Sequence, residues 1–280
     1  MNRFLPLSLI VLSLIFGNAG ARAETRLHHV HLLAQDPVAV AEFYAARLPV
    51  RRTRMFGAEA LDASPCALVI SAAAEVRQAK TAVWHLGWGA LDIRAEYIRQ
   101  LDLGTPFAQP LEYLLPGAYF AYIAAPHGVE VEINSSKNAG FGHVHLYSLH
   151  PAVAGEWYAR YLGLRPARPL STAPVQVGRY ALSSAAYLDA GGVGLLIFPK
   201  PDGVDDLLPS EGTGVDHLAF LVDNLDTKLA DLRRSGARIV APAREMEAGW
   251  RGAMVMGPDR MKIELLERRL MGPSTVDIRQ

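Results

Sequence analysis

Six histidine and glutamate residues, spaced alike in the two halves of the sequence, could form metal sites. Each half has the order His, His, Glu, and the six residues are His29, His85, Glu132, His143, His217 and Glu264. In both halves the glutamate follows the second histidine by 47 residues. Two imidazoles and one carboxylate that converge from three strands suit Fe(II), Mn(II) or Zn(II), and they leave coordination positions for substrate or water.

Neighbouring residues of the same types have to be distinguished from these candidates. Alternate residues of a strand share a face, so Glu130 could replace Glu132, but the matched 47-residue interval favours Glu132. His31 and His145 lie one side-chain step further along and are expected to support the ligands rather than to bind metal. At any single position, the alternative is a histidine satisfied in the core or a solvated glutamate. The repetition of the whole set favours metal binding.

The elements that must position these residues are themselves repeated. Residues 29–48, HVHLLAQDPVAVAEFYAARL, and residues 143–162, HVHLYSLHPAVAGEWYARYL, align without a gap. Each stretch begins with the alternation of a strand and continues, after an Asp-Pro or His-Pro pair, with helical spacing. The same pattern begins again around His85 and around His217, and short strand-like runs follow each helix. The sequence therefore predicts four units of one strand, one helix and about three strands, with a linker at residues 135–142.

The third unit is longer than the first. His85 follows His29 by 56 residues, whereas His217 follows His143 by 74. The loop at residues 199–214, PKPDGVDDLLPSEGTG, is expected to contain much of this 18-residue excess. A long loop of this kind could bind a ligand or cover a site, or it could be a solvated surface loop.

Composition narrows the possible partners. The chain has 280 residues, of which 50% are hydrophobic and 20% are charged, and its formal net charge is zero. A neutral chain without a basic block is a poor candidate for binding nucleic acid or an anionic membrane. Cys66 is the only cysteine, which excludes an intramolecular disulfide and a thiolate-rich metal site. A small-molecule substrate is the expected partner.

The first 23 residues have the features of a signal peptide. Arg3 supplies a basic start, residues 4–16 are an apolar run, and Ala21-Arg22-Ala23 has the small residues of a cleavage site. The apolar run is short for a membrane span, and a permanent anchor is the alternative interpretation. We therefore expect residues 1–23 to be removed and the mature chain to be exported, periplasmic or secreted. Residues 269–280 are expected to form a C-terminal tail.

The repeated unit resembles those of a known superfamily. Histidines stand in the openings LHHVHL, AVWHLG, FGHVHL and GVDHLAF, and glutamates stand in the closings HGVEVEI and DRMKIEL. On these motifs residues 27–268 are similar to the vicinal oxygen chelate superfamily, which includes glyoxalase I, extradiol dioxygenases, and fosfomycin- and bleomycin-resistance proteins. The resemblance implies an α+β fold of four βαβββ units, paired into two cupped-sheet domains at residues 24–135 and 140–268. By the family pattern the first domain holds a metal through His29, His85 and Glu132, and the second through His143, His217 and Glu264.

Two departures from the family patterns bear on the activity. Glyoxalase-type lyases carry a fourth ligand, a carboxylate, on a strand that reads PCALVIS or GVGLLIF here, without an acid. The stretch from Tyr122 to Glu132 resembles the tyrosine-to-glutamate stretch of extradiol dioxygenases, so Tyr122 is the candidate catalytic residue. The histidine expected before that tyrosine is absent, and Met254 stands at the matching place in the second half. The alternative is that Tyr122 is a packed aromatic residue.

The expected function is therefore that of a metal-dependent enzyme whose small substrate chelates the metal through two oxygens. An extradiol-type dioxygenase is the first choice, with Fe²⁺ as the first-choice cofactor and Mn²⁺ or Zn²⁺ as alternatives. A three-ligand site would leave room for both the substrate and O₂. The alternatives are a glyoxalase-like lyase or isomerase, and a small-molecule binder of the bleomycin-resistance type. Converging ligands argue against a metal-free binder, and export argues against a lyase that uses cytoplasmic glutathione.

Overall fold

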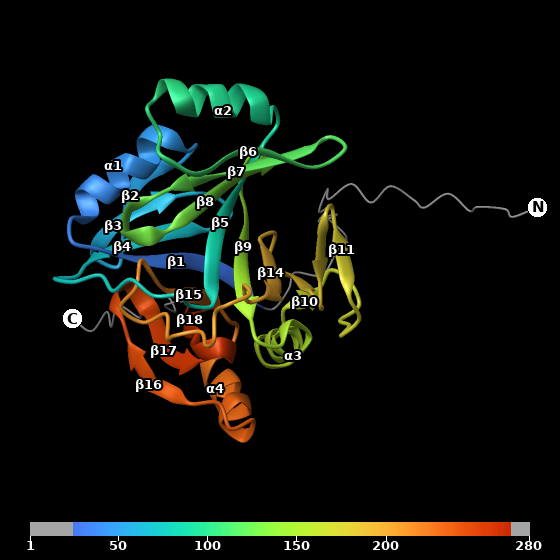
Figure 1. Cartoon of the computed structure of the whole chain (residues 1–280). Coiled ribbons are helices and arrows are strands. Elements are labelled where there is room, and N and C mark those ends of the chain that lie inside the picture. Colours follow the sequence, from blue (N-terminus) through green and yellow to red (C-terminus); the bar gives the residue numbers. More distant parts are fainter. Residues whose placement is uncertain (1–24, 270–280) are drawn as a thin grey trace, which may run out of the picture.

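The computed structural model describes residues 25–269 and has the expected α+β fold (Figure 1). The expected signal peptide, residues 1–23, lies outside the described residues, as does the expected tail beyond Arg269. Within residues 25–269, no helix combines the length and the apolar character needed to cross a bilayer.

The four expected units follow one another along the chain. The first comprises β1 (Arg26–Ala34), α1 (Pro37–Arg47), β2 (Arg51–Met55), β3 (Ala58–Asp62) and β4 (Ala67–Ala72). The second comprises β5 (Val83–Ala90), α2 (Ile93–Asp102), β6 (Phe107–Leu115), β7 (Ala118–Ala124), the turn η1 (Pro126–Gly128) and β8 (Glu130–Ser135).

The third unit has additional short strands. It comprises β9 (Gly140–Ser148), α3 (Pro151–Trp157), the helical turn η2 (Tyr158–Leu162), β10 (Arg165–Pro166), β11 (Val175–Val177), β12 (Tyr180–Leu182), β13 (Ala186–Asp189) and β14 (Gly194–Pro199). The fourth comprises β15 (Val215–Leu221), α4 (Leu225–Arg234), β16 (Ile239–Glu245), η3 (Glu247–Gly249), β17 (Trp250–Met256), η4 (Pro258–Arg260) and β18 (Lys262–Arg268).

Side-chain caps explain where three of the four main helices begin. Asp36 accepts a hydrogen bond from the amide of Ala39, and Asp92 accepts from the amides of two residues in the first turn of α2. Asn224 caps α4 in the same way. These side chains satisfy amides that have no partner inside the helix. Each cap stops the preceding strand and sets the position at which its helix packs against a sheet.

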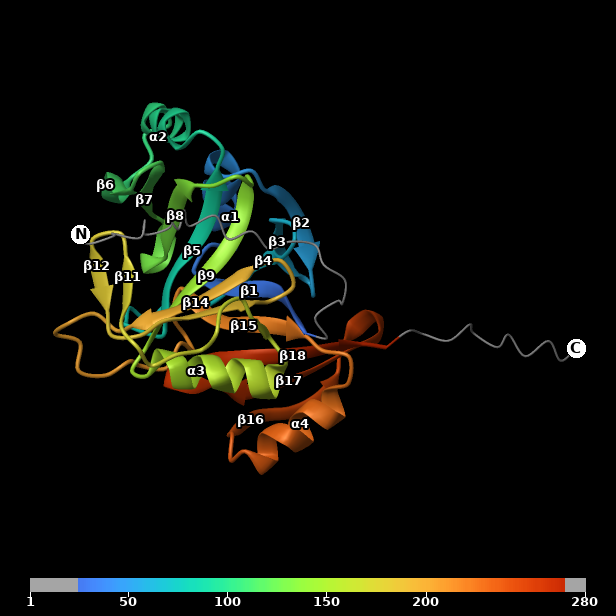
Figure 2. The ribbon, with the colours of Figure 1, turned by 90° about the vertical axis from the view of Figure 1, so that its right-hand side faces the viewer.

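The pairing of the units differs from the expected one. One eight-stranded sheet has the order β16-β17-β18-β15-β1-β4-β3-β2, so it joins the fourth unit to the first. The other has the order β10-β13-β14-β9-β5-β8-β7-β6 and joins the third unit to the second. Figure 1 shows blue β1 beside β15, and Figure 2 shows β5 beside β9. The expectation that residues 24–135 and 140–268 each build one cupped sheet was therefore wrong.

The pairing is made by two central antiparallel contacts, β1 with β15 and β5 with β9. Each contact brings together the strands that open two units, and one face of each strand is buried in a continuous apolar core. Val30, Leu86, Val144 and Leu218 are completely buried in this core. The residues that alternate with them face the concave side of each sheet, where the histidines lie.

Most of the extra length of the third unit lies before β14, not in the loop at residues 199–214. Ala67 pairs with His29 and follows it by 38 residues, whereas Gly194 pairs with His143 and follows it by 51. The 13 additional residues include the β11–β12 hairpin, and the later loop accounts for the remaining five. That later loop is anchored rather than solvated throughout, because the Ser210 hydroxyl is buried and donates to the carbonyl of Asp216.

Candidate metal centres

The structure brings the six expected ligands together in two clusters, but not in the expected groups. His85, Glu132 and His143 form one cluster, called here the Tyr122 cluster after its neighbouring tyrosine. His29, His217 and Glu264 form the other, called the Met254 cluster. Each cluster takes one histidine and the glutamate from one unit, as the 47-residue interval predicted. The third ligand comes from the other half of the chain, because the sheets pair the second unit with the third and the fourth with the first.

The donor atoms of the Tyr122 cluster converge on one point. His85 Nε2 lies 2.7 Å from Glu132 Oε2 and 3.2 Å from His143 Nε2, and His143 Nε2 lies 3.6 Å from Glu132 Oε2. Ligands about 2.0–2.2 Å from one ion lie roughly 3 to 3.5 Å from each other, close to these separations. The donor set therefore fits a divalent cation.

A glycine makes room for His143 in this cluster. Gly87 pairs with His143 across the β5–β9 contact, and a Cβ atom on Gly87 would lie 2.0 Å from His143 Cε1. Any side chain at this position would displace the imidazole. The His143 ring can therefore lie against β5 only where that strand has a glycine. Sequence reasoning missed this role, and the signal was the glycine that follows His85 by two residues.

The charges in the Tyr122 cluster match those that a metal site requires. Burial lowers the pKa of His85, against the opposing effect of Glu132, so the imidazole is neutral near neutral pH. Burial would raise the pKa of Glu132, but its electrostatic attraction to His85 and its hydrogen bonds with His143 and His85 outweigh burial and hold that pKa well below its usual value. Neutral imidazoles and an ionised carboxylate are the forms that bind metal.

Tyr122 lies against this cluster. It is buried on β7, where it pairs with Glu132, and its ring centroid is 5.0 Å from that of His85. Burial, reinforced by the charge of Glu132, raises the pKa of Tyr122 above its ordinary value. The hydroxyl group is therefore protonated and able to donate a hydrogen bond at the edge of the cluster.

His145 is closer to the Tyr122 cluster than expected for a purely supporting residue. One of its ring nitrogens lies within 4.8 Å of a donor atom of each of the three ligands. Its buried Nε2 atom has no hydrogen-bond partner in the part of the chain that the structure describes. The ring packs edge-on against His85, with centroids 4.7 Å apart, and against Phe198, at 4.1 Å.

The Met254 cluster has a more symmetric arrangement. His29 Nε2 and His217 Nε2 each lie 3.6 Å from Glu264 Oε2. Both nitrogens are buried and lack a hydrogen-bond partner within residues 25–269. Two unpaired imidazole nitrogens that face one carboxylate are costly without a cation between them, because buried polar groups are otherwise hydrogen-bonded. This cluster also fits a divalent metal ion.

Two residues that the sequence analysis missed support His217. Asp216 Oδ1 lies 2.6 Å from His217 Nδ1 and accepts a hydrogen bond from Lys262 Nζ at 3.1 Å. Burial lowers the pKa of His217, but the hydrogen bond to Asp216 and the charge of Glu264 outweigh it, and the pKa is raised. The negative environment that favours a proton on His217 equally favours a metal cation. The available signal was an acid immediately before the histidine.

Both clusters have an apolar residue where a fourth carboxylate could stand. Glu132 pairs with Gly87, two residues after His85, and Glu264 pairs with Ala219, two residues after His217. In the partner units the equivalent pairs are Val69 with His31 and Leu196 with His145. Val69 and Leu196 therefore stand where the carboxylates would be, and both are buried. The additional carboxylate of the glyoxalase pattern is therefore absent from both positions.

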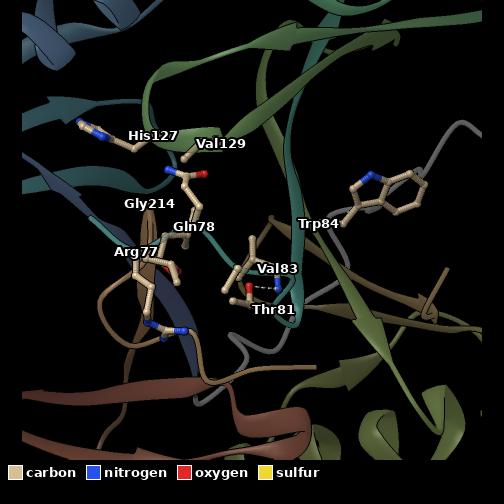
Figure 3. Close-up of a pocket in the computed structure, with 12 residues that line it drawn as sticks. Arg77, Gln78, Thr81, Val83, Trp84, His127, Val129 and Gly214 are labelled. Carbon is tan, nitrogen blue, oxygen red and sulfur yellow. Dashed lines mark hydrogen bonds between the residues drawn. The ribbon is translucent and has the colours of Figure 1, made fainter. Parts of the chain in front are cut away.

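A small cavity lies between the two sheets, apart from the ligands (Figure 3). Its volume is about 50 Å³, and its walls include Arg77, His127 and Gly214. The Trp84 side chain points away from Arg77 and His127 (Figure 3). A cavity of this size can hold water but not a substrate with a carbon skeleton. This cavity is therefore too small to be the substrate site.

Comparisons with known proteins agree with the architecture. Residues 140–265 match the model of the Glyoxalase/Bleomycin resistance protein/Dioxygenase superfamily. Glyoxalase I from Zea mays has a similar structure, with a TM-score of 0.69, 14% identity, and coverage of 87% of this chain and 92% of that one. A putative dioxygenase from Bacillus subtilis has a TM-score of 0.60, 15% identity, and coverage of 90% and 87%. A search of curated proteins found no match.

At these identities, the solved structures establish the fold and not the activity. The family match covers the third and fourth units, and the structural similarity extends over all four. Residues 140–265 are thus similar to this superfamily in sequence, and the repeated βαβββ units and two curved sheets give the whole described chain the fold of glyoxalase I.

Proposed function

We propose that this protein is a metal-dependent enzyme, and that its reaction takes place at the Tyr122 cluster on a small substrate with two vicinal oxygens. The observation that carries the proposal is the pairing of a buried, protonated Tyr122 with Glu132 of a two-histidine, one-carboxylate set. Such a set leaves open positions on one side of a metal. A metal-free binding protein would have no use for two buried imidazoles and a carboxylate that converge on one point.

An extradiol-type oxygenation is the reaction that we propose. Fe(II) bound by His85, His143 and Glu132 would supply Lewis acidity towards the substrate oxygens and redox chemistry towards O₂. The apolar Leu196 at the fourth-ligand position supports this proposal, because a three-ligand site keeps room for both reactants. Residues of the protein would supply proton donation and exclude water.

Tyr122 would act on the substrate directly. Its hydroxyl would donate a hydrogen bond, or a proton, to a substrate oxygen held beside the cluster, because burial keeps the group protonated. Trp84 stacks on Tyr147 with centroids 4.8 Å apart, and the Trp84 ring lies 4.6 Å from that of His85. These rings would form an apolar wall that limits water around the reacting atoms.

A lyase or isomerase activity is the second candidate, and the position of His145 favours it. A fourth protein ligand at the same ion would leave places for the two substrate oxygens but none for O₂ in a six-coordinate site. Chemistry on a chelated carbonyl compound needs no third open position. The two candidates therefore predict opposite dependence on O₂.

The test is oxygen uptake by the protein loaded anaerobically with Fe(II) or with Zn(II), over a panel of vicinal diols and enediols. We expect O₂ consumption with at least one substrate in the Fe(II) form and none in the Zn(II) form, because Zn(II) has no redox chemistry. Turnover that is equal in both forms and independent of O₂ would replace this proposal with the isomerase one. Failure of the protein to retain either metal would overturn both.

A further inference from the structure

We propose that the Met254 cluster is a closed structural metal site that fastens the first unit to the fourth, and that the Phe56 ring is the cover that closes it. The inference rests on metal binding by the two clusters, but it does not depend on the reaction proposed for the Tyr122 cluster. Three features carry it: the cover over the cluster, the fixation of its ligands, and the distance along the chain that its ligands span.

Phe56, the proposed cover, packs in a group of rings beside the cluster. The Phe56 ring lies 5.9 Å from that of ligand His29, and it also contacts His28 at 6.0 Å and Trp250 at 5.7 Å between centroids. His28 and Trp250 are themselves 5.0 Å apart, so the three rings form a closed group. His28 reaches this place because the β1–β15 register shifts between Leu27 and His29.

The backbone of Phe56 has an unusual conformation for so large a residue. Phe56 and Gly57 form the two-residue turn between β2 and β3, with φ values of 51° and 75°. Turns of this kind favour Asn-Gly, because few side chains tolerate a positive φ. The packing of the ring over His29 offsets this strain, which gives the position a role beyond turning the chain.

Two of the three ligands are less exposed in the Met254 cluster than their counterparts in the Tyr122 cluster. The side chains of His29, His217 and Glu264 are 1%, 5% and 7% exposed. Of the equivalent residues, His143 is 10% and Glu132 is 13% exposed, whereas the His85 side chain is 0% exposed. Met254 also offers no acidic proton at the place where the other cluster has Tyr122. Access and proton donation are thus both reduced at the covered cluster.

The ligands of the Met254 cluster are held in place before metal arrives. His217 is oriented by Asp216, which accepts hydrogen bonds from the amide of Gly212 and from Lys262. The Lys262 amide in turn donates to Ser210 in the preceding loop. An imidazole fixed by a carboxylate in this way binds metal more tightly.

A metal at this cluster would join distant parts of the sequence. His29 lies near the start of the described chain and Glu264 near its end, and the ion would connect β1 directly to β15 and β18. A link that closes a long loop removes conformational freedom from the unfolded chain and stabilises the fold. At the Tyr122 cluster the ligands span a much shorter stretch of chain.

The test measures metal release from the fully loaded protein into an excess of a chromogenic chelator, without substrate. We expect a fast phase from the Tyr122 cluster and a slow phase from the Met254 cluster. Glu264→Gln should remove the slow phase, and Glu132→Gln should remove the fast one, which assigns each phase. Equal release rates from the two clusters would overturn the proposal.

Phe56→Asn is the decisive variant, because asparagine tolerates the turn conformation while the ring is lost. The slow phase should accelerate by about tenfold or more, since the apolar shell around a site controls access to it, and the fast phase should not change. Phe56→Leu, which keeps apolar bulk, should give an intermediate rate. Tyr113→Asn, which removes an exposed ring from the other sheet, is the matched control and should leave both phases unchanged. An unchanged slow phase in Phe56→Asn would show that Phe56 is not the cover.

The structural role is tested separately by thermal unfolding. Relative to metal-free protein, loading the Met254 cluster alone, in Glu132→Gln, should raise Tm more than loading the Tyr122 cluster alone, in Glu264→Gln. An ion that binds only the folded state stabilises it by mass action, and tighter binding gives the larger shift. The reverse order would assign the structural role to the Tyr122 cluster instead.

Discussion

The two clusters have equivalent ligands but different neighbours. Opposite the glutamate, one has Tyr122 and the other has Met254. Immediately before the central histidine, the first has Trp84 and the second has Asp216. The Phe56 ring lies 5.9 Å from that of His29 in the second cluster. In our proposals the ligands bind a cation at both clusters, whereas the neighbouring residues determine what can reach it. One duplicated arrangement of strands would then serve turnover at one cluster and stability at the other.

The largest expected effect tests how the ligands are grouped. His143→Ala should empty the site that contains Glu132 and leave the site that contains Glu264 loaded. Adding Glu132→Ala should therefore remove no further metal, whereas adding Glu264→Ala should remove the second ion as well. Metal content per chain, measured after reconstitution and desalting, distinguishes the two double variants. If the combination with Glu132→Ala loses both ions, the ligands are grouped within each half of the sequence instead. Glu130→Ala is the control and should keep both ions.

A smaller effect, confined to one cluster, is expected from Gly87→Ala. The new methyl group would occupy the place of the His143 ring, so the Tyr122 cluster should lose its metal while the Met254 cluster keeps its own. Gly142→Ala is a matched control, because a Cβ atom there comes no nearer than 4.0 Å to its neighbours. Metal analysis of both variants checks the prediction. Full metal content in Gly87→Ala would show that His143 is not a ligand.

Tyr122→Phe should reduce turnover without releasing metal. Loss of a general acid or hydrogen-bond donor typically slows a reaction by about a hundredfold to ten-thousandfold. The corresponding change at the other cluster, Met254→Leu, should leave the rate unchanged, because turnover is assigned to the Tyr122 cluster. The measurement is the rate with the best substrate of the panel, normalised to bound metal. Equal slowing by the two variants would contradict the assignment of turnover to one cluster.

The smallest expected effect concerns the support of His217. Asp216→Asn keeps the shape of the side chain but removes the charge that holds the His217 imidazole, so metal affinity at the Met254 cluster should fall by about 10- to 100-fold. Trp84→Phe, at the equivalent place, should not change the affinity of the Tyr122 cluster. Competition with a chelator of known affinity measures both. Equal losses in the two variants would mean that the clusters are supported in the same way.

The sequence alone was sufficient to locate the repeated units and the ligand positions. His85 and Glu132 lie on neighbouring parallel strands of one unit, and His217 and Glu264 lie on the equivalent strands of another. The chain between these two strands has the same length in both units. The shared 47-residue interval therefore indicates the same pairing register between the strand of the histidine and the strand of the glutamate. The same interval decided between Glu130 and Glu132, which strand alternation places on one face.

Only the tertiary structure decided which third ligand completes each cluster. His29 and His143 open equivalent strands with nearly the same sequence, so each could pair with either central partner. Which of the two antiparallel contacts forms depends on how four similar units pack, and local alternation is identical in both arrangements. Phe56 and Asp216 were missed for a related reason. The contact of Phe56 with His29 arises across the fold, and no spacing within a repeated unit records it. Asp216 is the neighbour of His217 in the sequence, but only the structure shows its carboxylate turned towards the imidazole.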